Sequence, residues 1–336
     1  MKTNINKTQD AGWNIGPQTL LPPAGASDVM RTSIANTPQP DVEAMQQVAP
    51  RTKEEWLAVI TETDAPKEDG LQTLLAQSPV SVQNDEIAGV PVFKVNPAEV
   101  DPRHENHLFV YVHGGAYILN RGKVGVMEAI IIAQRCQMPV LSIDYRMPPE
   151  HPFPAGLEDV VTVYQHLLKD HPATSMTLGG TSAGGGLILT ATSKLNELGV
   201  DVPGALYAGT PWTDLTKTGD SYITNEGVDR LLITYDGLLE GAAHLYAGNK
   251  NLKDPLISPV YGKFHDFPPT FLVTGTRDLF LSNTARTHTK MRAAGVVADL
   301  LVFEGVSHGD YAFEPTSPES LQTYAELNAF LLRHLQ

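Results

Sequence analysis

The chain has a single cysteine, Cys136, and therefore no internal disulfide framework. It also lacks an apolar run of about 18 residues, so no membrane-spanning helix is expected. Its 24 Lys and Arg residues are outnumbered by 38 Asp and Glu residues, and they form no visible cluster. The net charge of −14 disfavours nucleic acid and anionic membrane surfaces as partners, because both attract clustered positive charge.

Metal- and cofactor-binding patterns are missing as well. No group of His, Cys and acidic residues has a ligand spacing such as HExxH, and no GxGxxG opens a helix after a strand. The glycine-rich stretch at residues 178–186 has no lysine before its serine, which argues against a phosphate-binding loop. We therefore expect neither a metal nor an organic cofactor.

The first 14 residues, MKTNINKTQDAGWN, lack the apolar middle of a secretory signal, so the cytoplasm is the expected compartment. Their polar composition resembles what often follows a removed signal. Secretion or a periplasmic location is therefore the alternative.

The stretch LGGTSAGGG at residues 178–186 is the most informative one present. It places Ser182 between Gly180 and Gly184, after a short apolar run and before a segment with helical spacing. A serine on so tight a strand-to-helix turn leaves no room for Cβ atoms two residues away on either side. This pattern predicts that Ser182 is a nucleophile and that the N–H of Ala183 faces a developing negative oxygen at the helix start.

A second set of backbone donors follows the apolar strand LFVYV at residues 108–112. His113 ends this strand, and Gly114 and Gly115 come directly after it. In acyl transfer such N–H groups stabilise the oxygen on which negative charge develops. We predict an oxyanion hole formed by Gly114, Gly115 and Ala183.

From about residue 85 to the C-terminus, the order and spacing of five segments resemble the hormone-sensitive-lipase family of α/β-hydrolases. The segments are HGGA at 113–116, DYRMPPEHPFPA at 144–155, GTSAG at 180–184, PWTDL at 211–215 and GVSHGD at 305–310. Thr181 resembles the GTSAG branch of the bacterial members. The resemblance implies a small carboxylesterase with a helical cap, an ester of short acyl chain as substrate, and a possible homodimer that pairs through the last strand.

In this fold the nucleophile is followed along the chain by an acid and then by a histidine. His308 follows an apolar strand within a glycine-flanked loop and is the predicted base. Asp278 follows the preceding strand and is the predicted acid, with Glu304 as a distant alternative. The family usually has Asp-Pro-Leu-x-Asp at this point, whereas this chain has Asp-Leu-Phe-Leu-Ser and so lacks the second carboxylate.

His113 is expected to support the oxyanion loop and not to act as the base, because a base must be aimed by a carboxylate. The family resemblance implies the same. The substrate pocket is expected to be lined by four residues near the motifs, for which core packing is the alternative: Tyr117, Trp212, Leu215 and Val306.

Apolar segments and helical segments alternate along the chain from residue 80 onward, which predicts a mostly parallel sheet covered by helices. The eight expected strands are 85–88, 90–95, 108–112, 139–143, 175–179, 204–209, 269–274 and 299–303. The expected helices between and after the later strands are 124–137, 156–169, 185–198, 282–294 and 318–335.

Two regions fall outside this alternation. Residues 1–80 contain proline-rich turns between helical stretches such as residues 40–45 and 52–60, with nothing strand-like. Residues 213–254 form a long helical insertion between two strands. We take them as the two parts of a helical cap. Residues 81–212 and 255–336 are then the two parts of an α/β-hydrolase core.

These residues predict two-step hydrolysis of short- to medium-chain carboxylic esters through an acyl-enzyme on Ser182. A lactone hydrolase or a small-molecule deacetylase with the same triad is the alternative, and an amidase or peptidase is a rival within the class. A non-catalytic binding protein of the same fold is disfavoured, because all three triad residues are present in order.

Overall fold

The computed structural model describes residue 12 and residues 15–336. Its centre is one eight-stranded sheet with the strand order β1-β2-β4-β3-β5-β6-β7-β8. Strand β2 pairs antiparallel with β1 and β4, and the other neighbours pair in parallel. The strands are β1 (Val80–Ile87), β2 (Val90–Pro97), β3 (Leu108–Val112), β4 (Val140–Ile143), β5 (Met176–Thr181), β6 (Ala205–Gly209), β7 (Thr270–Gly275) and β8 (Ala298–Phe303).

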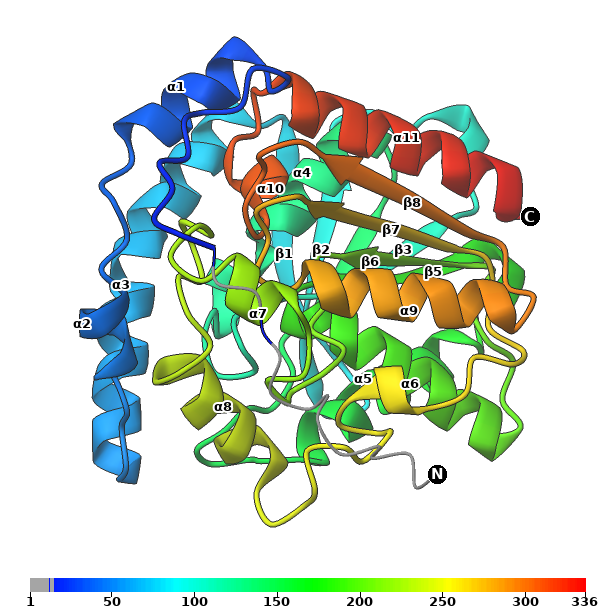
Figure 1. Ribbon diagram of the computed structural model, residues 1–336. Coiled ribbons are helices and arrows are strands. Elements are labelled where there is room, and N and C mark those ends of the chain that lie inside the picture. Colours follow the sequence, from blue (N-terminus) through cyan, green and yellow to red (C-terminus); the bar gives the residue numbers. More distant parts are fainter. Residues whose placement is uncertain (1–11, 13–14) are drawn as a thin grey trace, which may run out of the picture.

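Helices cover both faces of this sheet (Figure 1). Helices α4 (Met127–Cys136) and α11 (Pro318–His334) lie on one face, and α5 (Ala155–Leu167), α6 (Ala183–Leu198) and α9 (Leu281–Ala293) lie on the other. Two apolar core clusters follow from this layering. Every residue of β5, β6 and β7 is buried, as expected for parallel strands covered on both sides. The predicted α/β-hydrolase sheet is thus confirmed.

The N-terminal segment contributes three helices, α1 (Asp28–Asn36), α2 (Val42–Gln46) and α3 (Lys53–Gln77), along one side of the molecule (Figure 1). Helix α3 begins at a capping box in which the Thr52 hydroxyl accepts from Glu55 N–H while the Glu55 carboxylate accepts from the Thr52 backbone. Only Trp56, Ile60 and Leu71 of its 25 residues are buried. The helix is therefore a largely exposed layer outside the core.

The insertion, residues 213–254, carries the short helix α7 (Ser221–Thr224) and α8 (Leu238–Ala247). It packs directly on the N-terminal segment, since the Trp56 ring lies against Gly241 and the Met45 carbonyl lies against Gly237. These contacts leave no room for a Cβ atom at Gly237. Their assignment to one cap remains a prediction.

Two further short helices complete the elements that matter for the site, α10 (Asp310–Phe313) and the 3-10 turn η2 (Gly122–Val126). Strand β8 is an edge strand, and the predicted pairing of two copies through it remains a prediction. Within the described residues, no helix is both long and apolar enough to cross a membrane.

Candidate active site

Ser182 lies at the tip of the turn between β5 and α6. Its backbone has φ 60° and ψ −122°, a left-handed conformation that is rare for a residue with a side chain. Two backbone hydrogen bonds hold this strained turn: the Ser182 N–H donates to Gly209 O at 2.8 Å, and the Trp212 N–H donates to Ser182 O at 2.8 Å. Ser182 is partly exposed although the residues on either side of it are buried. The turn therefore presents the hydroxyl-bearing residue outward.

The glycines of the motif are required by the close approach of the backbone. A Cβ atom on Gly184 would lie 2.0 Å from the Val112 carbonyl oxygen, and one on Gly180 would lie 2.5 Å from the same oxygen. Helix α6 thus begins in direct contact with the end of β3. That contact brings the segment after β3 next to Ser182.

The oxyanion loop, residues 113–116, follows β3 at this point. A Cβ atom on Gly114 would lie 3.0 Å from Ser182 Cβ, so the loop and the serine are in contact. Gly115 has φ +115°, which only glycine adopts freely, and both glycines are partly exposed. Ala183 is the first residue of α6, where helix N–H groups lack intrahelical acceptors. Gly114 and Ala183 therefore lie next to Ser182, and Gly115 directly follows Gly114.

His113 is tied to this loop and has no carboxylate among its hydrogen-bond partners in the described part of the chain. Its Nδ1 lies 2.8 Å from Gly114 O, so Nδ1 carries a proton, and Asn120 Nδ2 donates to the same oxygen at 3.1 Å. The ring stacks on Tyr145 at 4.5 Å between centroids. Burial lowers the pKa of His113, which keeps the imidazole neutral. This arrangement suits a support of the loop.

Asp278 and His308 come together from the loops after β7 and β8. His308 Nδ1 lies 3.0 Å from Asp278 Oδ1. The carboxylate also accepts from the Thr274 hydroxyl at 2.7 Å and from the Phe280 N–H at 2.8 Å. Both side chains are almost fully buried. The aspartate can therefore orient the imidazole in the manner that a general base requires.

The surroundings of His308 favour its protonated form. Burial lowers the pKa of the imidazole, but Asp278 and Asp229 raise it by more, so that it lies above the ordinary value. The Phe280 ring lies edge-on against His308 at 4.9 Å and stacks on Trp212 at 5.2 Å. Because the Trp212 N–H donates to Ser182 O, this aromatic row runs from the histidine to the serine turn.

The predicted pocket residues Tyr117, Trp212, Leu215 and Val306 are all fully buried. The first three belong to the core cluster that includes Phe280, whereas Val306 packs in the cluster on the other face of the sheet. Tyr117 stacks on Tyr246 of α8 at 3.8 Å. Of the four, Tyr117 and Trp212 are in contact, with 5.8 Å between ring centroids, and the role of all four as pocket walls stays a prediction.

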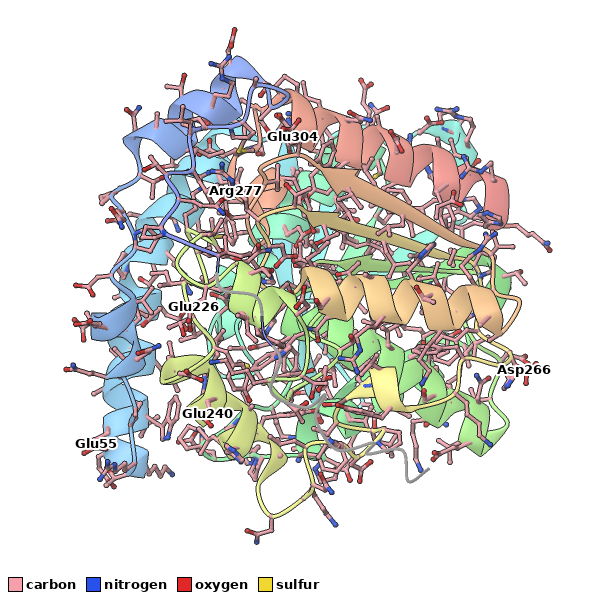
Figure 2. All side chains as sticks on the ribbon, in the orientation of Figure 1. Glu55, Glu226, Glu240, Asp266, Arg277 and Glu304 are labelled. Atoms are coloured by element: carbon pink, nitrogen blue, oxygen red, sulfur yellow. The ribbon has the colours of Figure 1, made fainter. Side chains whose placement is uncertain are left out.

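The alternative acid, Glu304, lies apart from His308. It is exposed and its carboxylate lies against Gly25 of the N-terminal segment. Figure 2 labels Glu304 and Arg277 on that side of the molecule. Asp278 is the carboxylate that contacts the imidazole nitrogen of His308.

A buried glutamate beneath the serine turn was not predicted. Glu128 of α4 accepts hydrogen bonds from the hydroxyls of Thr181 at 2.9 Å, Tyr207 at 2.8 Å and Tyr111 at 2.8 Å. Burial raises the pKa of Glu128, and these donors oppose the rise. The residue before the nucleophile is thus held by a hydrogen-bond network under the sheet. Its members are far apart in sequence, so no local motif reveals it.

Several known proteins are similar to this chain. The family signature described as the alpha/beta hydrolase fold matches residues 109–312. One solved esterase structure is 55% identical, covers 97% of this chain and 99% of its own, and superposes with a TM-score of 0.95. An esterase of the bacterial hormone-sensitive lipase family is 28% identical over 90% of this chain and 95% of its own, with a TM-score of 0.73. An acetyl-hydrolase of Streptomyces hygroscopicus is 31% identical over 70% of this chain and 78% of its own.

The chain therefore belongs to the alpha/beta-hydrolase fold family, and within it to the hormone-sensitive-lipase-like group of bacterial esterases. It is a carboxylic ester hydrolase. The family predicted from the five motifs is confirmed, while its assignment to the GTSAG branch stays a prediction.

Proposed function

We propose that the protein is a serine carboxylesterase that hydrolyses short- to medium-chain esters with Ser182 as nucleophile, His308 as base and Asp278 as acid. The observation that carries this proposal is the 3.0 Å contact between His308 Nδ1 and Asp278 Oδ1, in loops that Phe280 and Trp212 link to a serine in a strained turn. A nucleophile, a base and a group that orients the base are what acyl transfer to a hydroxyl requires.

In the first step Ser182 Oγ attacks the ester carbonyl carbon while His308 Nε2 takes the hydroxyl proton. The carbonyl oxygen becomes an oxyanion, which the N–H groups of Gly114, Gly115 and Ala183 stabilise. The imidazolium then returns its proton to the leaving alcohol, and an acyl-enzyme remains. Water, deprotonated by His308, attacks this acyl group and releases the acid.

The proposed preference for modest acyl chains rests on the packing around the serine. Trp212 is fully buried and donates its N–H to Ser182 O, Tyr117 and Leu215 are buried in the same core cluster, and Tyr246 of α8 stacks on Tyr117. Bulky aromatic side chains of this kind leave limited space for an acyl chain in a dry pocket. Rates are expected to fall as the chain lengthens.

The test is a rate profile across p-nitrophenyl esters of increasing chain length, for the wild type and for Ser182→Ala. Removing the nucleophile is expected to lower kcat by about a thousandfold or more on every ester. Fluorophosphonate labelling is the control, since the folded wild type should form an adduct on Ser182 and the variant should not. Activity of Ser182→Ala near the wild-type level would contradict the proposal.

A second candidate is a deacetylase of acetylated small molecules, which uses the same three residues. The relative from Streptomyces hygroscopicus that is named an acetyl-hydrolase favours it. A lactone hydrolase that uses the same three residues is a further alternative. Comparing acetate release from acetylated alcohols and amines with hydrolysis of p-nitrophenyl acetate separates these activities.

A further inference from the structure

Asp229 is a fully buried carboxylate in the insertion, and it bonds both to its own turn and to the loops that carry the predicted acid and base. Its Oδ1 accepts from the N–H groups of Leu231 at 2.9 Å and Leu232 at 3.0 Å. Its Oδ2 accepts from the Leu279 N–H at 2.7 Å and from the His308 N–H at 3.3 Å. One oxygen thus joins residue 279, next to the acid, to the backbone of the base.

The neighbouring residues of the insertion contact the same two loops. Asn225 Nδ2 donates to the carbonyl oxygens of Asp278 at 2.8 Å and Thr276 at 3.2 Å. The Arg230 N–H donates to the Ser307 hydroxyl at 3.3 Å. Residues 225–230 therefore fix the loop that carries Asp278 and the loop that carries His308 relative to each other.

The acid loop of this chain has one carboxylate where the related motif has two, because Ser282 occupies the place of the second. Asp229 brings a second carboxylate to the backbone N–H of His308 from a different part of the chain. An imidazolium forms at His308 only during the reaction, and a second negative charge nearby stabilises that form. Asp229 therefore stabilises the transition state more than it stabilises the resting enzyme.

We propose that Asp229 is a positioning residue for the hydrolysis, which fixes the His308 backbone relative to Asp278 and supplies a second negative charge to the imidazolium. This inference rests on the proposed triad. Asp229 itself touches neither substrate nor Ser182 in this role. It acts through His308, and it makes the insertion part of the catalytic machinery.

The charged groups around His308 are Asp278 on the acid loop, Asp229 on the insertion and Asp310 at the start of α10, and the last of these pairs with Arg230. The three carboxylates raise the pKa of His308 against the effect of burial. Burial raises the pKa of Asp229 to about 6, with a further rise from Asp278. Asp229 is therefore charged at pH 8, where the esterase rate is measured.

The test is Asp229→Asn, which keeps the size of the side chain. Whichever way the amide turns, two of the four N–H groups lose their acceptor, and the negative charge is gone. We expect kcat to fall about tenfold or more at pH 8 with KM nearly unchanged. The acid limb of the kcat/KM profile should move to lower pH by about one pH unit, because His308 loses a charge that raises its pKa.

Asp214→Asn is the matched control, since Asp214 is an equally buried carboxylate of the insertion that pairs with Arg286 and Tyr261 and has no contact with His308. This control should leave the acid limb where it is in the wild type. If Asp229→Asn keeps the wild-type limb and loses no more activity than Asp214→Asn, the inference is overturned and Asp229 is only structural.

If Asp229→Asn is not recovered folded, as judged by circular dichroism, the same profile is measured on Asp229→Ser, which removes the charge and leaves room for water near the N–H groups. If the acid limb of the kcat/KM profile of Asp229→Ser lies at the wild-type position, the inference is likewise overturned. Wild-type and Ser182→Ala rates measured in parallel report on the triad itself. If the proposed function is wrong, the wild-type and Ser182→Ala rates will show it. If only this inference is wrong, those two rates will be as expected and the variants at residue 229 will show it.

Discussion

The histidine at residue 308 has its imidazole held between a hydrogen-bonded carboxylate and an aromatic ring. Asp278 contacts the ring nitrogen at 3.0 Å, and Phe280 closes one side at 4.9 Å. The oxyanion loop holds a second buried histidine, His113, whose Nδ1 faces a carbonyl oxygen. The pKa of His308 is raised by its carboxylates and that of His113 is lowered by burial, so their titrations separate them.

We predict that kcat/KM of the wild type falls on acidification with a midpoint above pH 6.5. The base must be neutral to accept the serine proton, and the pKa of His308 is raised from its ordinary value of 6.5 by Asp278 and Asp229, which outweigh burial. Initial rates on p-nitrophenyl acetate from pH 5 to pH 9 give the profile. A midpoint below 6.5 would match His113 instead, since burial lowers its pKa.

The site residues that the sequence revealed are those with a local signal. Ser182 has glycines two residues away on both sides, and Asp278 and His308 each follow an apolar strand. Asp229 and Glu128 have no such signal, because their partners lie 79 and 53 residues away along the chain. Contacts of that separation depend on how the strands are ordered in the sheet, and motif spacing does not encode them.

At the scale of elements, the serine turn depends on how closely α6 begins against β3. The same crowding extends along the first turn of the helix, since a Cβ atom on Gly186 would lie 2.3 Å from Trp212 O. Glycine lowers the stability of a helix relative to alanine, but it allows this close approach of two backbones. The helix is therefore placed by backbone contact, and the position of Ser182 follows from it.

We predict that Gly184→Ala destabilises the protein by about 3 kcal/mol or more and greatly reduces esterase activity, because the added carbon would lie 2.0 Å from Val112 O and must displace backbone. Urea unfolding followed by circular dichroism measures the loss. Gly70→Ala in α3 is the matched control: its nearest neighbour would be Met127 Cε at 3.8 Å. That change should stabilise the protein by about 1 kcal/mol, and equal stability of the two variants would contradict the argument.

The strands were predictable because buried parallel strands are nearly continuous apolar runs, and β3 has the predicted bounds of residues 108–112. The N-terminal helices were less predictable from the sequence. Helix α1 was not predicted, and α3 extends to Gln77, well past the predicted stretch that ends at Ile60. Helix α3 buries few residues, so its sequence carries little apolar periodicity, and α1 is only 9 residues long.

At the scale of the whole molecule, three distant parts of the chain meet at one guanidinium. Arg230 of the insertion donates to the hydroxyls of Ser33 and Thr37 at the end of α1, each at 2.8 Å. It also pairs with Asp310 of α10 at 3.1 Å, two residues after His308. The two predicted parts of the cap are thus joined to each other and to the histidine loop through one partly buried side chain.

We predict that Arg230→Met lowers the free energy of unfolding by about 3 kcal/mol at pH 8, because it leaves the buried carboxylate of Asp310 without its partner. Burial already raises the pKa of Asp310 and Arg230 opposes the rise, so the pKa rises further in the variant. A carboxyl group whose pKa is higher in the folded than in the unfolded protein destabilises the fold as pH rises. The loss of unfolding free energy in Arg230→Met should therefore be smaller at pH 5 than at pH 8. Thermal unfolding at both pH values measures it.

Arg333→Met is the control for this prediction. Arg333 pairs with Asp299 at 2.9 Å, but the two side chains are 54% and 47% exposed. Solvent-exposed pairs contribute about 1 kcal/mol or less, so this variant should unfold close to the wild type at both pH values. If Arg230→Met behaves like Arg333→Met, the guanidinium does not join the N-terminal segment and the insertion to the histidine loop. If the deficit is large but independent of pH, Asp310 is not the group that the loss of Arg230 leaves unpaired.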